Sequence, residues 1–163
     1  MAAAFEKKYG KSAPERADFQ YERAMVWFRV KDYTKAKDAF EKVADDFGES
    51  PRGPWAEFHL AKIEELTGEA DKAYEGYREV AKRHPDSDVK PRALLSAANY
   101  HLKAERYEEA TGLYQQITAS PATAGDILPY AMTNLISAYE SVKLYENALQ
   151  MTRDFIQRWP NDP

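Results

Sequence analysis

Apolar and small residues recur along the chain with a helical period, and the arrangement occurs four times. In the first copy an alanine is followed four and seven residues later by bulky side chains, as Ala36, Phe40 and Val43 show. The matching alanines of the other copies are Ala73, Ala110 and Ala148. Successive alanines are 37, 37 and 38 residues apart. Self-similarity at such a period predicts stacked supersecondary units in place of one closed core.

Each copy predicts two helices, because apolar residues recur at i, i+3, i+4 and i+7 over two successive stretches. In the first copy the first helix opens after Pro14, the turn falls at Lys31 and Asp32, and the second helix begins at Tyr33. Gly48 ends this second helix, since glycine suits the left-handed position that follows a helix. The predicted repeats are residues 14–50, 51–88, 89–125 and 126–163.

Small residues stand near the middle of both helices of a copy, where they let the two helices approach closely. The pairs are Ala24 with Ala36, Ala61 with Ala73, and Ala98 with Ala110. Because neither helix can bury its apolar stripe alone, each copy needs the next one to cover it. About three copies are required before such a stack is stable.

Turn tyrosines and closing prolines accompany these alanine pairs, at Tyr33, Tyr107, Tyr145, Pro85 and Pro160. Together the features resemble the tetratricopeptide repeat (TPR) family over about residues 15–163. The resemblance implies an all-α fold, a right-handed superhelical α-solenoid of about four helix-turn-helix repeats whose first helices line a concave groove. The loop at residues 84–87 is also similar to loops of bacterial envelope TPR proteins, such as the β-barrel assembly lipoprotein and the Tol–Pal coordinator. This second likeness slightly favours the periplasm or cell envelope over the cytoplasm.

Residues 1–13 imitate the end of a second helix, because Phe47 and Gly48 have parallels in Tyr9 and Gly10. We therefore expect an N-terminal partial helix, the remnant of a preceding repeat, in a chain that is part of a larger bacterial protein. The open alternative is an ordinary N-terminal capping helix.

Composition excludes several function classes. A net charge of −4 with basic and acidic residues interspersed lacks the basic footprint of a nucleic-acid binder. The chain has no cysteine, and no apolar run approaches the ~20 residues that cross a bilayer. No metal-binding or nucleophile motif surrounds the three histidines, His59, His84 and His101, which we assign to structural or exposed positions. We expect neither a cofactor nor a metal, and no catalysis.

The resemblance places a partner-binding groove on the first helices, aromatic in its N-terminal half and polar in its C-terminal half. Exposed aromatic side chains are the usual hot spots of interfaces, so an extended or helical peptide is expected to dock on them. The candidate groove residues are Tyr21, Met25, Phe28, Trp55, Phe58, Lys62, Arg92, Leu95 and Asn99. Packing between repeats is the open alternative for the aromatic members, and it is the assignment for Trp27 and Trp159.

The predicted function is therefore a non-catalytic protein-interaction module or scaffold with a protein or peptide partner, without nucleic acid and without membrane insertion. The alternative is a structural scaffold that self-assembles into a homo-oligomer through open repeat ends. The absence of a polar capping helix after Trp159 motivates this alternative.

Overall fold

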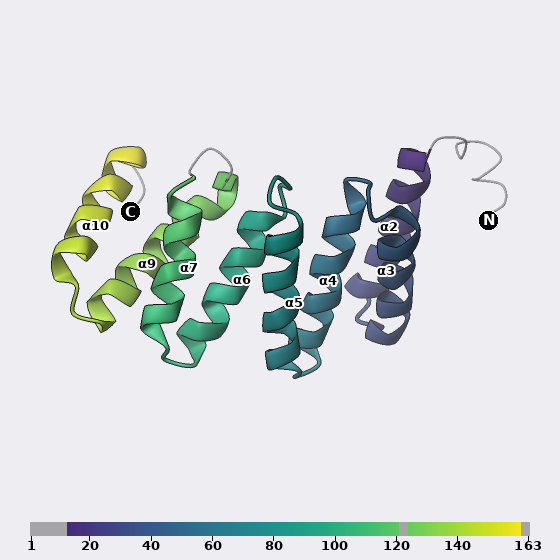
Figure 1. Ribbon diagram of the computed structural model, residues 1–163, viewed down its shortest axis with the longest axis horizontal. Coiled ribbons are helices and arrows are strands. Elements are labelled where there is room, and N and C mark those ends of the chain that lie inside the picture. Colours follow the sequence, from purple (N-terminus) through teal and green to yellow (C-terminus); the bar gives the residue numbers. More distant parts are fainter. Residues whose placement is uncertain (1–12, 121–123, 161–163) are drawn as a thin grey trace. The chain divides into compact units, whose positions relative to one another are not determined.

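The computed structural model describes residues 13–120 and 124–160, which form eight α-helices and one short 3-10 helix, with no strand among them (Figure 1). The elements are α2 (Ala13–Arg29), α3 (Tyr33–Phe47), α4 (Arg52–Leu66), α5 (Ala70–Arg83), α6 (Lys90–Lys103), α7 (Tyr107–Thr118), η1 (Gly125–Ile127), α9 (Leu128–Ser141) and α10 (Tyr145–Arg158). The all-α prediction is confirmed.

The chain divides into two compact units, of which unit 1 ends at Val89 and unit 2 begins at Lys90. In unit 1 each of the helices α2 to α5 packs against the next, and α2 also contacts α4. In unit 2 the helices α6, α7, α9 and α10 pack in the same sequential way, with η1 against α6 and α9. Each unit thus holds two helix-turn-helix repeats, which confirms the repeat prediction, while the right-handed sense of a whole superhelix stays a prediction.

Small residues bring the two helices of a repeat close together, as the sequence predicts. Ala24 and Ala36 are fully buried between α2 and α3, and Ala61 and Ala73 are 2% exposed between α4 and α5. A Cβ atom added to Gly76 of α5 would lie only 2.8 Å from the Cβ of Ala61. The contact between α4 and α5 therefore leaves no room for a further methyl group.

One residue in each turn between paired helices has a left-handed backbone. These residues are Lys31 (φ 61°), Gly68 (φ 92°), Glu105 (φ 56°) and Lys143 (φ 62°). The following residue donates its N–H to a carbonyl five positions earlier, as Asp32 does to Trp27 at 3.0 Å. The carbonyl of Asp32 then accepts from the N–H of Ala36 at 2.9 Å, which starts the second helix. This bonding closes the first helix in the manner of a Schellman motif and recurs in all four repeats.

Gly48 does not adopt the left-handed conformation that its position after α3 predicted. Its φ of −54° and ψ of −38° are right-handed. A Cβ on Gly48 would lie 2.8 Å from the carbonyl oxygen of Ala44, and a Cβ on Gly53 would clash with the backbone of Gly48. Glycine is therefore required here for close approach of the backbone between α3 and α4, rather than for a positive φ.

The N-terminal partial helix predicted for residues 1–13 lies outside the described residues, apart from Ala13, the first residue of α2. Over the described ranges, every helix is too short or too polar to cross a membrane.

Candidate functional site

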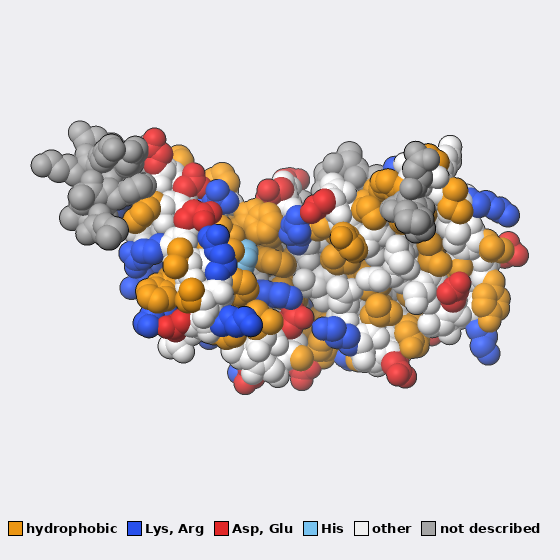
Figure 2. All heavy atoms as spheres, turned by 180° about the vertical axis from the view of Figure 1, so that it is seen from behind, with side chains coloured by type: hydrophobic (Ala, Val, Ile, Leu, Met, Phe, Trp, Pro, Cys, Tyr) orange, Lys and Arg blue, Asp and Glu red, His pale blue; other side chains and the backbone are white. Residues whose placement is uncertain are grey.

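Aromatic side chains from α2, α3 and α4 converge on His59 in unit 1. The His59 ring stacks on Phe40 at a centroid distance of 5.0 Å, and Phe28 and Phe58 meet it edge-on at 5.3 and 5.5 Å. Trp55 lies next to it at 6.3 Å. Phe28, Trp55 and Phe58 are partly exposed, and we call them, with His59, the aromatic face of unit 1. The left part of Figure 2 shows hydrophobic side chains gathered around a histidine.

Within the described residues, the hydrogen bonds of His59 involve only Nδ1 of its ring. Nδ1 lies 2.8 Å from the carbonyl oxygen of Trp55 and 3.2 Å from the hydroxyl of Tyr21. Burial lowers the pKa of His59, Lys62 lowers it further, and the contact with the Trp55 carbonyl opposes this shift. The imidazole is consequently neutral at physiological pH.

Trp55 is fixed by contacts on both of its ring edges. Its indole Nε1 donates to Oδ1 of Asp88 at 2.9 Å, and its ring meets Phe58 nearly at right angles at 5.9 Å. Phe58 in turn packs on Tyr77 at 5.4 Å, and the Tyr77 hydroxyl donates to Oε2 of Glu65 at 2.7 Å. The aromatic face is therefore held in one arrangement before any partner binds.

Ion pairs border the aromatic face. They join Arg52 to Asp18 (Nε–Oδ1 2.5 Å), Arg29 to Glu22 (Nη2–Oε2 3.1 Å) and Lys62 to Glu65 (Nζ–Oε2 2.8 Å). Each pair is at least partly exposed to water, so its contribution to stability is at most about 1 kcal/mol. Their main consequence is that positive and negative charges cancel along the border of the face.

Tyr21 requires a correction, because it was predicted as a groove residue. Its side chain is 5% exposed and packs against Phe40 at 5.7 Å. Burial raises the pKa of Tyr21 to about 12. Tyr21 therefore belongs to the core of unit 1 and cannot serve as a surface anchor. The other predicted groove residues of unit 1 are partly exposed: Met25, Phe28, Trp55, Phe58 and Lys62.

The first helices of unit 2 present polar groups around Arg92 and Asn99, while Tyr130 of α9 is an exposed aromatic residue (67%). Nη2 of Arg92 donates to both carboxylate oxygens of Asp126, at 3.0 and 2.8 Å. Oδ1 of Asn99 accepts from the hydroxyl of Tyr114 at 2.6 Å and from Nδ2 of Asn134 at 3.2 Å. The predicted groove residues Arg92, Leu95 and Asn99 are all partly exposed. By the 37-residue repeat, Arg92 occupies the position of Trp55, Leu95 that of Phe58 and Asn99 that of Lys62.

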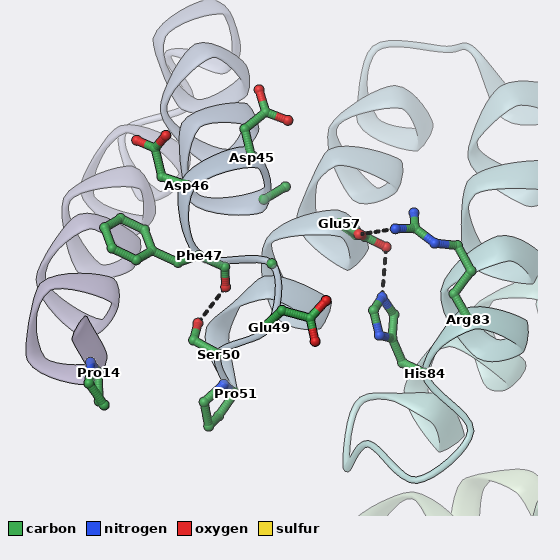
Figure 3. A pocket seen from close by; sticks show the side chains of 12 residues that line it. Pro14, Asp45, Asp46, Phe47, Glu49, Ser50, Pro51, Glu57, Arg83 and His84 are labelled. Carbon is green, nitrogen blue, oxygen red and sulfur yellow. Dashed lines mark hydrogen bonds and ion pairs between the residues drawn. The ribbon is translucent and has the colours of Figure 1, made fainter.

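A cleft of about 600 Å³ opens beside the connection between α3 and α4, with Phe47 and Pro51 in its wall (Figure 3). The carboxylate of Glu57 binds Arg83 at 3.2 Å and His84 at 2.9 Å. Glu57 and His84 have side chains only 15% and 18% exposed, so these bonds tie the end of α5 to α4. Glu57, Arg83 and His84 are thus bonded to one another, which gives His84 a structural role.

Sequence reasoning missed the central place of His59 and the role of Asp88. The available signal was a histidine next to Phe58 and Leu60 and one helical turn after Trp55. This signal did not show which rings would surround it. Asp88 lies 33 residues from Trp55, and only the packing of the α5–α6 connection brings them together.

Sequential helix pairs with small residues at their crossings define a helical-repeat scaffold. A family model described as the tetratricopeptide repeat-like domain matches residues 3–128, and the chain belongs to this family. No curated protein matches the chain by sequence.

Solved structures with the same fold include nearly identical TPR-like repeats of a kinesin light chain-like protein from Podosopora anserina. They share 16% sequence identity with the chain at a TM-score of 0.64, covering 98% of this chain and 84% of that one. A single-residue variant of those repeats matches at 17% identity and a TM-score of 0.65, with the same coverage. BtubC (BKLC) from P. vanneervenii matches at 15% identity and a TM-score of 0.70, covering 90% of this chain and 65% of that one.

The TPR-like family is in general a non-catalytic protein-interaction fold, and membership of it supports a protein-interaction scaffold in general. The likeness to bacterial envelope proteins stays a prediction.

Proposed function

We propose that this chain is a non-catalytic protein-interaction module that captures a segment of a partner protein on the aromatic face of unit 1. The observation that carries the proposal is a group of partly exposed aromatic rings, Phe28, Trp55 and Phe58, around His59 on the first helices. Aromatic side chains near the centre of an interface dominate binding energies, and single truncations there cost about 2 kcal/mol or more.

The fixed geometry of the face supports this role. Because Asp88 and Phe58 already hold the ring of Trp55, binding costs little side-chain entropy at that position. Lys62, at the border of the face, adds a flexible apolar stem that a partner can cover.

On unit 2 the proposal assigns a different contribution to the first helices. Taken by itself, unit 2 offers the amide groups of Asn99 and Asn134 and the partly exposed Leu95 to the backbone and small side chains of a partner. Their contribution to affinity is expected to be smaller, because hydrogen bonds exchanged with water add only about 0.5–1.5 kcal/mol each.

Peptides selected from a random display library on the intact chain provide the test. Phe58→Ala should weaken binding of a selected peptide by roughly 30-fold, the equivalent of about 2 kcal/mol. Leu95→Ala is the matched control, since Leu95 occupies the same repeat position in unit 2. Circular dichroism should show unchanged helicity for both variants. Unchanged affinity in Phe58→Ala together with a large loss of stability would assign Phe58 to packing instead.

A second candidate function is self-association through α10, as a structural scaffold. Tyr145, Leu149 and Ile156 lie on one stripe of this helix and are 58%, 51% and 59% exposed. The position of Leu149 corresponds to Thr111 of α7, which is only 8% exposed in unit 2, where α7 packs against α9. The exposed stripe of α10 thus matches a face that is covered inside the unit.

Light scattering over a concentration series separates the two functions. Self-association should raise the average mass with concentration, and Leu149→Lys should abolish the increase. A constant monomer mass removes this second candidate and leaves the first one untouched.

A further inference from the structure

The hydrogen bonding of His59 fixes which ring nitrogen carries the proton. A carbonyl oxygen can only accept, so the 2.8 Å contact with the Trp55 carbonyl requires a proton on Nδ1. In the neutral imidazole the other nitrogen, Nε2, is then an acceptor with a free lone pair. Nε2 has no hydrogen-bond partner among the described residues, and it is not sealed from solvent.

Apart from the Tyr21 hydroxyl and the Trp55 carbonyl on the Nδ1 side, the rings around the imidazole are apolar. The rings of Phe28, Phe40 and Phe58 lie within 5.5 Å of the imidazole centroid, and none of them can bond to Nε2 in its plane. A partner side chain that covers the face removes water from Nε2. Unless it returns a hydrogen bond, the buried acceptor is left unsatisfied, which opposes binding.

Charge around the face also limits the kind of partner. The cations Arg29, Arg52 and Lys62 each pair with a carboxylate of unit 1. The carboxylate of Asp88, which accepts from the Trp55 indole, leaves one negative charge in excess at the border and so disfavours an acidic segment.

We infer that the aromatic face of unit 1 selects a partner segment without acidic residues, anchored by an aromatic side chain that carries its own N–H or O–H group, which donates to Nε2 of His59. Such an anchor matches both the rings of the face and its acceptor. Its ring packs edge-on or offset against Phe28 and Phe58, and its N–H or O–H group donates to Nε2 of His59. This inference rests on the proposed function and adds the chemistry of the partner to it.

Indole and 1-methylindole are matched probes, since they differ by the N–H group and the methylated probe is the more hydrophobic of the two. They are titrated at pH 7.5 into the intact chain labelled uniformly with ¹⁵N and ¹³C, and NMR signals of Trp55, Phe58 and His59 locate the binding. Indole should bind about tenfold more tightly than 1-methylindole, because indole donates to Nε2 of His59 and the methylated probe buries Nε2 without a hydrogen bond. The ¹⁵Nε2 signal of His59 should shift with indole and stay in place with 1-methylindole.

Two variants test the assignment to Nε2. His59→Phe keeps a ring in the cluster and should abolish the preference for indole. Tyr21→Phe removes the hydroxyl next to Nδ1 and should preserve the preference, because it leaves Nε2 unchanged. If His59→Phe does not fold, the affinity ratio and the Nε2 signal of the unaltered chain decide the question.

The outcomes separate this inference from the proposed function. Equal affinities for the two probes, with the Trp55 and Phe58 signals perturbed by both, overturn the donor requirement and leave the interaction surface standing. No perturbation of these signals by either probe contradicts both the donor requirement and the surface itself.

Discussion

Unit 1 and unit 2 are built from the same repeat, yet their first helices carry different chemistry. Phe58 in unit 1 and Leu95 in unit 2 occupy equivalent positions, and both are partly exposed. The neighbouring position holds His59 in the first unit and Ser96 in the second. The repeat therefore fixes where a side chain lies, while the identity of that side chain decides whether the surface is an aromatic cluster or a polar network.

The second helices show another contrast. Three of them carry a large aromatic ring at the same repeat position, and the fourth does not. The position four residues after the small alanine holds Phe40, Tyr77 and Tyr114, each at most 2% exposed. In α10 the same position holds Thr152, whose hydroxyl donates to the carbonyl oxygen of Ala148 at 2.8 Å. The last repeat thus lacks the large buried ring that fills the others.

The largest expected effect comes from truncating this ring. Phe40→Ala should lower the free energy of unfolding by about 3–5 kcal/mol, because it leaves a cavity in the core of unit 1. Thr152→Ala should cost about 1 kcal/mol or less, the value of one hydrogen bond at a half-buried site. Urea unfolding followed by circular dichroism measures both. Similar losses for the two variants would show that the fourth repeat packs as tightly as the first.

An intermediate effect is expected from acid, through His59 of unit 1. Burial lowers the pKa of His59 below its ordinary value of 6.5 in the folded state. As the pH falls through about 6.5, the unfolded chain takes up the proton before the folded chain does. The contribution of His59 to stability is therefore full above about pH 6.5 and is lost as the pH falls towards its folded pKa.

Melting temperatures between about pH 8 and pH 5 test this sign with His59→Phe as the matched variant. The unaltered chain should lose more stability on acidification than the variant, because phenylalanine does not titrate. The residues of unit 2 at the equivalent repeat positions, Ser96 and Asn134, do not titrate either. Parallel pH profiles for chain and variant would show that His59 is not the titrating group.

The comparison also shows what the sequence could predict. Periodic apolar positions and the pairs of small residues were enough for the helices, because burial of one helix face determines both. Tyr21 was misassigned, since helical spacing alone does not distinguish a ring that faces a neighbouring helix from one that faces water. The surroundings of His59 depend on rings from three helices, and those contacts exist only after packing.

The turns were also only partly predictable. Because Gly48 is a glycine after a helix, it was expected to be left-handed. Its backbone is right-handed, and it lies against the backbone of Gly53 at the start of α4. The residue types of Lys31 and Glu105 did not indicate a left-handed backbone. Their positive φ follows from the hydrogen bonds that end the first helix and start the second, which the sequence does not show.

The smallest expected effect concerns these turns, where the two units should behave alike. Lys31→Gly in unit 1 and Glu105→Gly in unit 2 should each stabilise the chain by about 0.5–1 kcal/mol, because glycine relieves the steric cost of a positive φ. Gly68→Ala should destabilise by about 1 kcal/mol, and through the backbone alone, since a Cβ at Gly68 meets no atom within 4 Å. Urea unfolding resolves differences of this size when all three variants share one slope. A gain in one unit but not in the other would mean that the two turns are held differently, despite their shared hydrogen bonds.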